Sequence, residues 1–274
     1  MIRTETNDGW LLVSHPHHAH LAGQFADAWG NALFPQPQPF KHVREAVYCH
    51  DDGWMARDAQ PFTTKQGKPE AFSRELVGKY SAFEEIDLPA YLKVRGEALE
   101  AVASRDRFAA IIVSKHTVNL LADQADITTI RPEQQQLHAD FIASQRNRQK
   151  ELVEQIRSSD PELAPLATEQ NLDAAFKFLQ CCDSLSLMIC VHYEQPRPLR
   201  HAQPVSSGGT KEILCTPRGD SVYALNPWPF REERQEFSFG VRRLSQKTFG
   251  SLEEYRAAFA NASVELHRAT LIAG

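Results

Sequence analysis

The chain has 274 residues, a net charge of −5 and a composition typical of globular proteins, with 42% hydrophobic and 24% charged residues. It contains no long lysine and arginine block, and no apolar run approaches the ~20 residues of a membrane helix, so we expect neither nucleic acid nor a membrane as partner. The five cysteines lack CxxC spacing and the first ten residues lack an apolar signal segment, which favours a cytoplasmic protein without a disulfide framework.

The first predicted elements surround an unusual concentration of histidine. Residues 9–15 form a candidate strand, and the segment HPHHAH at 15–20 leads into a helix predicted over 18–31. The proline-rich segment 34–40 then connects to a second helix over 41–54. That helix places His50 on the apolar face and ends near Gly53.

Apolar residues at helical spacing predict four further helices before residue 195. They span residues 90–105, 108–124, 132–159 and 169–193. The third of them has a long polar face, whereas the fourth is the most apolar. His116 and Asp183 lie on the apolar faces of the second and the fourth.

The composition changes at 194–211 to proline, glycine and serine, which indicates a linker. Residues 212–217, 221–230 and 236–244 then alternate with the period of strands, with a turn at PRGD. A closing helix over 251–263 begins with Ser251 as its cap and Glu254 as the capping-box partner. The sequence therefore predicts a mainly α protein: a helical metal-binding domain at 1–195, with a linker and a small antiparallel β extension at 196–274 packed on it.

Four segments place a metal-binding side chain on an apolar helix face, and these residues are the candidate ligands His18, His50, Asp51, His116 and Asp183. An unpaired carboxylate inside a core costs several kcal/mol, roughly, and a divalent cation shared with imidazoles compensates for it. Mixed nitrogen and oxygen ligands suit one or two ions of Mn, Fe, Zn, Ni or Co rather than Ca.

Each of these residues also has a structural interpretation. A single buried histidine is usually a hydrogen-bonded core residue, and the Asp183 carboxylate could pair with an arginine such as Arg44, Arg57 or Arg146. The first ligand could be any of the clustered histidines His15, His17, His18 and His20. His18 is preferred because it shares the stripe of apolar residues on its helix.

A helical histidine, an adjacent His-Asp pair and a distant aspartate on a late helix resemble the HD-domain superfamily of metal-dependent phosphohydrolases. The wider pattern HAHLAGQFADAW … AVYCHDDGW … IIVSKH … CDSLSL … NPWPF is similar to a bacterial family of unassigned function. The resemblance implies an HD-like helical bundle, with His18, His50, Asp51 and Asp183 as ligands and His116 as a ligand of a second metal. It also implies a small phosphoester substrate and a metal-activated water.

The chain departs from the HD pattern because no lysine or arginine follows the His-Asp pair directly. We therefore expect Lys115 and Arg57 to stabilise charge on the substrate, with Lys65 and Lys68 as further candidates for binding phosphate. Asp52 or His116 could accept a proton or orient a ligating imidazole. Trp54 and Phe72 could stack on a ring of the substrate.

Two other functions fit parts of the sequence. A helical protein that binds a metal or a small ligand without turnover would need the same ligands but no substrate-binding charge. A metallo-hydrolase built on HPHHAH, similar to metallo-β-lactamases or amidohydrolases, is disfavoured by Ala19 where an aspartate is expected and by the shortage of predicted strands. Motifs of nucleotide-binding proteins and serine hydrolases are absent from the sequence.

Overall fold

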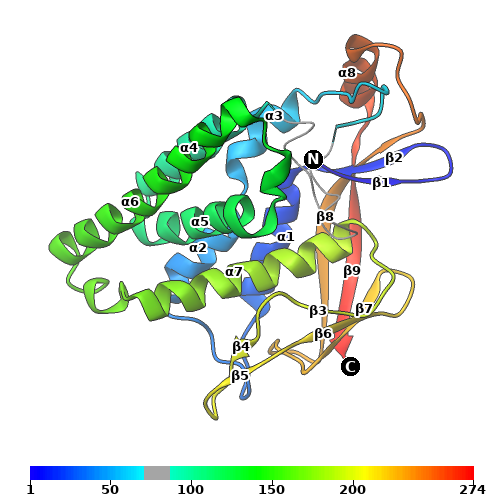
Figure 1. The fold of residues 1–274 in the computed structure, drawn as a ribbon. Helices are drawn as coiled ribbons and strands as arrows, with labels where there is room; N and C mark the ends of the chain where they lie inside the picture. Colours follow the sequence, from blue (N-terminus) through cyan, green and yellow to red (C-terminus); the bar gives the residue numbers. More distant parts are fainter. Residues whose placement is uncertain (71–86) are drawn as a thin grey trace.

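The computed structural model describes residues 1–70 and 87–274, and Figure 1 shows a layer of helices packed beside a long mixed sheet. About 51% of the described residues are helical and 19% lie in strands, most of them in one seven-stranded sheet. The expected mainly α, HD-like bundle with a small antiparallel β extension is therefore wrong. The sheet is larger than predicted, and it includes strands from both ends of the sequence.

The sheet has the strand order β1-β2-β8-β9-β7-β6-β3. Neighbours are antiparallel except for the parallel pair β7 and β9. A separate two-stranded ladder joins β4 and β5. The strands are β1 (Ile2–Glu5), β2 (Trp10–Val13), β3 (Arg197–Pro198), β4 (Gln203–Pro204), β5 (Thr210–Lys211), β6 (Leu214–Pro217), β7 (Val222–Asn226), β8 (Arg234–Leu244) and β9 (Val264–Ala273).

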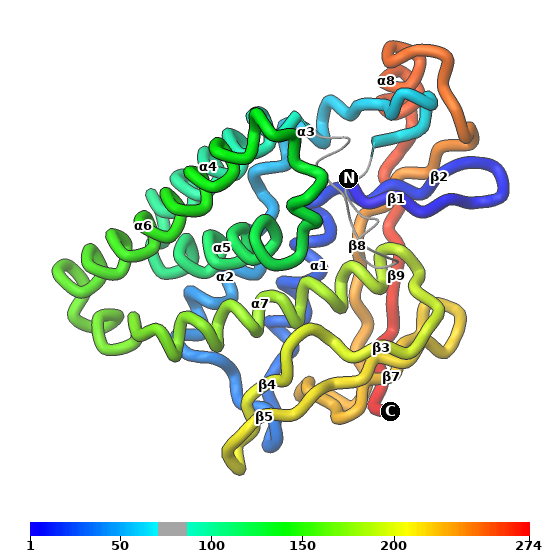
Figure 2. Tube along the Cα trace, viewed as in Figure 1, coloured from blue at the N-terminus to red at the C-terminus, as the bar shows by residue number. Residues whose placement is uncertain are grey.

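Three strands of this sheet, β1, β3 and β9, were not predicted, and β3 lies within the segment 194–211 that was expected to be a linker. The strand expected at 9–15 is present as β2, but it forms a hairpin with β1 and pairs along β8, so the N-terminal segment joins the C-terminal strands (Figure 2). The strand β9 was missed because only Ala269 and Leu271 of its ten residues are buried, which leaves little alternation in the sequence. Its ladders to β8 and β7 are long-range pairings that no local pattern encodes.

The predicted helices are confirmed within a few residues at their ends, which is the usual uncertainty of helix boundaries. The helices are α1 (His15–Ala28), α2 (Phe40–Cys49), α3 (Met55–Ala59), α4 (Leu88–Ala103), α5 (Arg107–Asn119), α6 (Gln135–Ser159), α7 (Glu169–Cys190) and α8 (Leu252–Asn261). The 3-10 turn η1 (Asp52–Trp54) follows α2, and the π-helical turn η3 (Leu120–Gln124) extends α5. Among the described residues, no helix has both the length and the apolar character needed to cross a membrane.

Short polar side chains cap the N-termini of several main helices. Ser14, Asp106 and Thr168 accept backbone N–H bonds at the starts of α1, α5 and α7. The predicted cap Ser251 accepts the N–H of Glu254, whereas the Glu254 carboxylate accepts the N–H of Gly250 instead of closing the expected box.

Helix α1 lies between the sheet and the remaining helices (Figure 1). The ring of Phe25 packs edge-on against Phe237 of β8, with the centroids 4.8 Å apart, and its neighbours on α1 pack against α2 and α7. Buried residues of all these elements form one continuous apolar cluster. Because α1 is held on both sides, side chains near its start have fixed positions.

Two glycines allow the helices around α1 and η1 to approach closely. A Cβ added to Gly53 would lie 2.3 Å from the Cβ of Ala98 on α4, and one added to Gly23 would lie 2.4 Å from the ring of Tyr48 on α2. Such separations are impossible for real side chains, so the absence of a side chain is required at both places. Gly53 in particular places η1 directly against α4.

We expect Gly53→Ala to lower the free energy of unfolding by about 1–3 kcal/mol, because the new methyl group overpacks the contact with Ala98. The matched control is Gly96→Ala on α4, where the added Cβ would meet only a ring atom of Phe141 at 3.8 Å. This change should raise stability by about 0.5–1 kcal/mol through helix propensity. Urea unfolding measures both values, and equal effects of the two substitutions would contradict the close-packing interpretation.

Candidate metal centre

His18 lies in the first turns of α1 with its ring buried. Its Nδ1 is 2.7 Å from Oγ of Ser186 on α7, and this hydroxyl itself donates to the carbonyl of Asp183 at 2.8 Å. Because the hydroxyl proton is already used, Ser186 must accept from Nδ1–H of His18. The proton of a neutral His18 is thereby placed on Nδ1, and the lone pair of Nε2 faces the interior.

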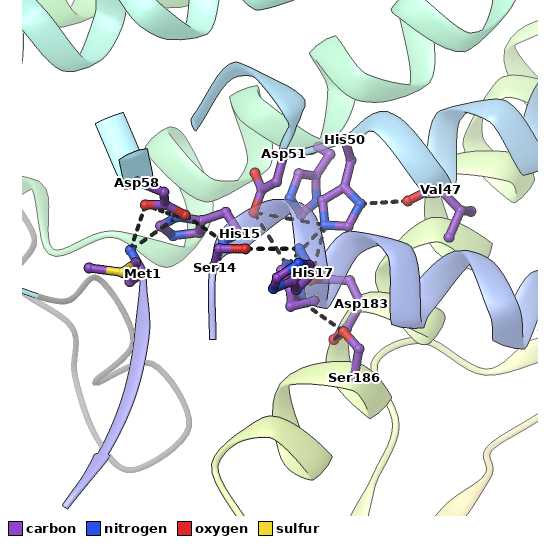
Figure 3. Close-up of polar contacts among 12 residues, drawn as sticks. Met1, Ser14, His15, His17, Val47, His50, Asp51, Asp58, Asp183 and Ser186 are labelled. Atoms are coloured by element: carbon purple, nitrogen blue, oxygen red, sulfur yellow. Dashed lines mark hydrogen bonds and ion pairs between the residues drawn. The ribbon is translucent and has the colours of Figure 1, made fainter. Parts of the chain in front are cut away.

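His50 is the C-terminal cap of α2, where the last carbonyl groups of a helix lack internal partners. Its Nδ1–H donates to the carbonyl of Val47 at 2.8 Å, as Figure 3 shows. The end of α2 therefore fixes both the ring orientation and the tautomer, and Nε2 is left to face His18.

Four ligand atoms from α1, α7 and the end of α2 converge. The Nε2 atoms of His18 and His50 are 3.2 Å apart, and Oδ2 of Asp51 lies 3.3 Å from the first and 3.9 Å from the second. Oδ1 of Asp183 lies 3.5 and 3.4 Å from the same two nitrogens. Ligands on adjacent corners of a metal with bonds of about 2.0–2.1 Å are separated by roughly 2.9–3.4 Å. Three of the five spacings lie in this range, whereas those of 3.5 and 3.9 Å exceed it, and the group of ligand atoms that all lie within 4.8 Å of one another does not include Asp183.

The predicted first ligand His18, the His-Asp pair and the late aspartate Asp183 are thus brought together by the fold, and all four residues are at most 6% exposed. His18, His50 and Asp51 alone form a buried group that could hold a metal ion. None of the arginines considered as alternative partners of Asp183 is needed to explain its burial. Arg44, for example, pairs with Asp27.

Arg95 on α4 is a member of the site that the sequence analysis missed. Its Nη1 donates to Oδ1 of Asp51 at 2.8 Å, while the guanidinium lies 5.0 Å from the ring centroid of Trp54 and contacts Tyr91. The signal was present in the sequence, because Arg95 occupies the apolar stripe of α4 together with Leu92 and Leu99. An arginine at such a position needs a buried anionic partner.

Attraction between opposite charges determines the direction of the pKa shifts of His50, Asp51 and Asp183. Burial lowers the pKa of His50, but its hydrogen bond to Asp183 and the charge of Asp51 outweigh burial and raise it to about 9. Burial raises the pKa of Asp51, yet Arg95 and the two histidines hold it well below its usual value. The pKa of Asp183 is also lowered, because His50 and its neighbours overcome desolvation. A proton on His50 therefore takes the place that a metal ion would occupy in balancing the two carboxylates.

His116 of α5 lies beside the cluster rather than within the group of closest ligand atoms. Its ring packs edge-on against that of His50, with centroids 5.2 Å apart, and its Nδ1 is 3.4 Å from Nε2 of Gln180. Burial, partly opposed by Asp183, lowers the pKa of His116 to about 3. His116 is therefore neutral at physiological pH.

The other histidines of HPHHAH have different partners. The Asp58 carboxylate lies 2.6 Å from the backbone N of His15 and 3.0 Å from its Nδ1 (Figure 3). The ring of His15 stacks on that of Trp54. His20 packs against the ring of Tyr48, and the ring of His17 touches Gly240. A cavity of about 330 Å³ at the start of α1 is lined by residues that include Ser14, His17, Met55, Asp58 and Arg242.

The three residues predicted to act on the substrate are engaged elsewhere. Lys115 pairs at 2.6 Å with Glu169, which lies about 21 Å along α7 from Asp183. Arg57 pairs with Glu70 at 2.9 Å, and Asp52 pairs with Arg105 at 3.3 Å near the surface. Phe72, proposed with Trp54 as a stacking wall, lies outside the described residues, and Trp54 is buried beneath Arg95 and His15.

Comparison with known proteins gives one match. Residues 1–246 match the family of proteins of unknown function DUF3891. No curated protein and no solved structure matches the chain.

The raised pKa of His50 predicts a pH-dependent stability of the metal-free protein. Histidine titrates near 6.5 in the unfolded chain and near 9 at this position, so the stabilisation is complete below pH 6.5 and is lost as the pH rises through 9. Between pH 6.5 and 8.5 we expect the free energy of unfolding in EDTA to fall by about 2 kcal/mol. His50→Gln, which cannot titrate, should lack this part of the fall.

The measurement is urea unfolding of both proteins in EDTA and with added zinc. A metal ion replaces the proton on His50, so zinc should abolish the difference in pH dependence between wild type and variant. Identical pH profiles of the two proteins in EDTA would contradict the assignment of a shared proton to this cluster.

Proposed function

The chain belongs to the DUF3891 family, and from its buried histidine and aspartate cluster we propose that it is a metal-dependent phosphohydrolase. The observation that carries the proposal is the pair of imidazole Nε2 atoms 3.2 Å apart, whose Nδ1 protons are both bound by protein acceptors. Two lone pairs at this distance repel each other unless a proton, as on His50 in the metal-free protein, or a metal ion lies between them. Oxygen atoms of Asp51 and Asp183 complete the set of donors.

We propose that His18, His50, Asp51 and Asp183 hold a divalent transition metal. Two imidazoles and two carboxylates suit Mn, Fe, Zn, Ni or Co. When bound, such an ion supplies Lewis-acid chemistry, polarising a phosphoryl oxygen and making a water acidic. Val47 and Ser186 hold the two imidazoles in the ligating orientation, a function that residues behind metal ligands commonly have.

The charge balance favours an anionic substrate. Asp51 and Asp183 contribute two negative charges, and Arg95 together with a divalent ion contributes three positive ones. The remaining positive charge is buried among helices, where it attracts a phosphate group more strongly than it would in water. A phosphomonoester or phosphodiester therefore suits the centre better than a neutral substrate.

The order of the ligands along the chain supports the same reaction class. A histidine, a His-Asp pair and a later aspartate follow the order of the HD-type phosphohydrolases that the sequence resembles. Arg95, contributed by the next long helix, supplies a cation beside the pair that the local sequence lacks. Asp51 nevertheless engages this guanidinium, so we assign Arg95 to positioning Asp51 and not to a direct contact with the substrate.

A second candidate function is metal binding without turnover. The pairing of Lys115, Arg57 and Asp52 with other side chains favours it, because these were the groups expected to act on a substrate. The two functions share the metal centre and differ in hydrolysis, so they are separated by one experiment on the same protein.

We expect Asp51→Asn and Asp183→Asn each to reduce bound metal by at least tenfold, because each removes a charged oxygen donor from the set. The matched control is Asp52→Asn, which changes the neighbouring exposed carboxylate and should leave the metal content unchanged. Elemental analysis of purified proteins and zinc titration measure the effect. Full metal content in both Asp51→Asn and Asp183→Asn would refute the centre.

Hydrolysis is tested by screening phosphomonoesters and phosphodiesters with added Mn, Fe and Ni. We expect turnover that requires metal, is lost in Asp51→Asn and persists in Asp52→Asn. Metal binding in wild type without hydrolysis of any substrate class would favour the binding protein and reject the phosphohydrolase.

A further inference from the structure

A chain of hydrogen bonds leads from the surface to His116, next to the metal ligands. Gln180 on α7 is fully buried, and its Nε2 is 2.7 Å from Oδ1 of Asn119 and 3.4 Å from Nδ1 of His116. Its Oε1 lies 2.6 Å from Nε2 of His201. The Gln180 amide therefore has one partner for its oxygen and two for its nitrogen.

The direction of this chain is fixed by Asp123 at its outer end. Asp123 and Asn119 both lie around the π-helical turn η3, and Nδ2 of Asn119 is 2.8 Å from Oδ2 of Asp123. A carboxylate only accepts hydrogen bonds, so the amino group of Asn119 must face Asp123 and its oxygen must face Gln180. The amino group of Gln180 then faces Asn119, and its oxygen faces His201. Reversing Asn119 would bring two acceptors together at Asp123, and reversing Gln180 alone would bring two oxygens together at Asn119.

The consequence for His116 is a defined tautomer. An amide N–H₂ group only donates, so Nδ1 of His116 must be the acceptor and carries no proton. A histidine with a bare Nδ1 is neutral and has its proton on Nε2.

We propose that His116 serves the centre as a fixed Nε2–H donor, not as a metal ligand, and that Gln180 is the residue that positions its proton. A nitrogen that carries a proton has no lone pair for a metal, which separates His116 from His18 and His50. Those two histidines are arranged in the opposite way, with Nδ1–H bound by the protein and Nε2 directed at the ligand cluster. The inference revises the expectation that His116 binds a second ion.

The position of His116 suggests which group receives the proton. Its ring packs against that of His50 at 5.2 Å, beside the ligand cluster. An N–H donor at this place can bind an oxygen atom of a water or a phosphoryl group that enters the centre, and such donors stabilise negative charge that develops there. This role rests on the proposed function, whereas the tautomer itself rests only on the hydrogen bonds.

The direct test is NMR of the imidazole nitrogens in ¹⁵N-labelled, metal-free protein at neutral pH, which distinguishes a protonated nitrogen from a bare one. We expect His116 to have its proton on Nε2 only. His138 is the internal reference, because its Nε2–H donates to the carbonyl of Leu121 at 3.2 Å. A proton on Nδ1 of His116, or on both nitrogens, would overturn the proposal.

Two substitutions test the role of the chain. Gln180→Glu places an acceptor opposite Nδ1, and we expect the proton of His116 to move from Nε2 to Nδ1. Asp123→Asn, at an exposed position, replaces a carboxylate that can only accept with an amide that can also donate, so the chain can run in either direction and should give a mixture of both tautomers. An unchanged Nε2–H signal in both folded variants would show that the chain does not set the tautomer.

A final measurement repeats the spectrum after one equivalent of zinc. We expect the Nε2–H of His116 to persist, while signals of His18 and His50 shift as they become ligands. Loss of that proton on zinc binding would make His116 a ligand and reject the proposal. Failure of zinc to bind would instead refute the proposed metal centre and leave the tautomer of His116 established by the metal-free spectrum.

Discussion

The structure around the centre depends on the enforced approach of two imidazole lone pairs inside a helical core. The Nδ1–H of each imidazole donates to an acceptor in the protein. For His50 the acceptor is a backbone carbonyl at the end of α2, and for His18 it is a serine hydroxyl on α7. Two buried carboxylates join them, and neither carboxylates nor lone pairs tolerate such proximity without a positive charge. A proton on His50 provides this charge in the metal-free protein, and a divalent cation would provide it more completely.

The surrounding structure keeps this arrangement in place. Arg95 neutralises one of the carboxylates and is itself held over Trp54, and η1 can bring Asp51 to it only because Gly53 packs directly on α4. Ser14 fixes the beginning of α1, and the sheet supports the opposite side of that helix. The charge of Arg95, the capped start of α1 and the close packing of η1 on α4 thus all fix the positions of the ligand side chains.

The sequence was sufficient to predict the helices and the ligand atoms that meet, because both are marked by local pattern: His18, His50 and Asp183 each interrupt an apolar stripe with a polar group. It was insufficient for the sheet, since β1 and β9 are defined by partners far away in the chain. The positively charged side chain beside the ligands was not identified from the sequence for a related reason. Lys115 and Arg57 were chosen by their proximity in sequence to ligands, whereas Arg95 reaches Asp51 across a helix interface. Its position on the stripe of α4 was a usable signal.

The position of β9 within the sheet has a consequence for how the molecule is made. This strand is the last along the sequence, yet it lies between β8 and β7 and pairs with both. During synthesis, β8 and β7 cannot complete their ladders until residues 264–273 have left the ribosome, and α1 packs on β8. The long-range pairing of β9 with both neighbours predicts slow folding, because the half-finished sheet has an open edge until that strand is added.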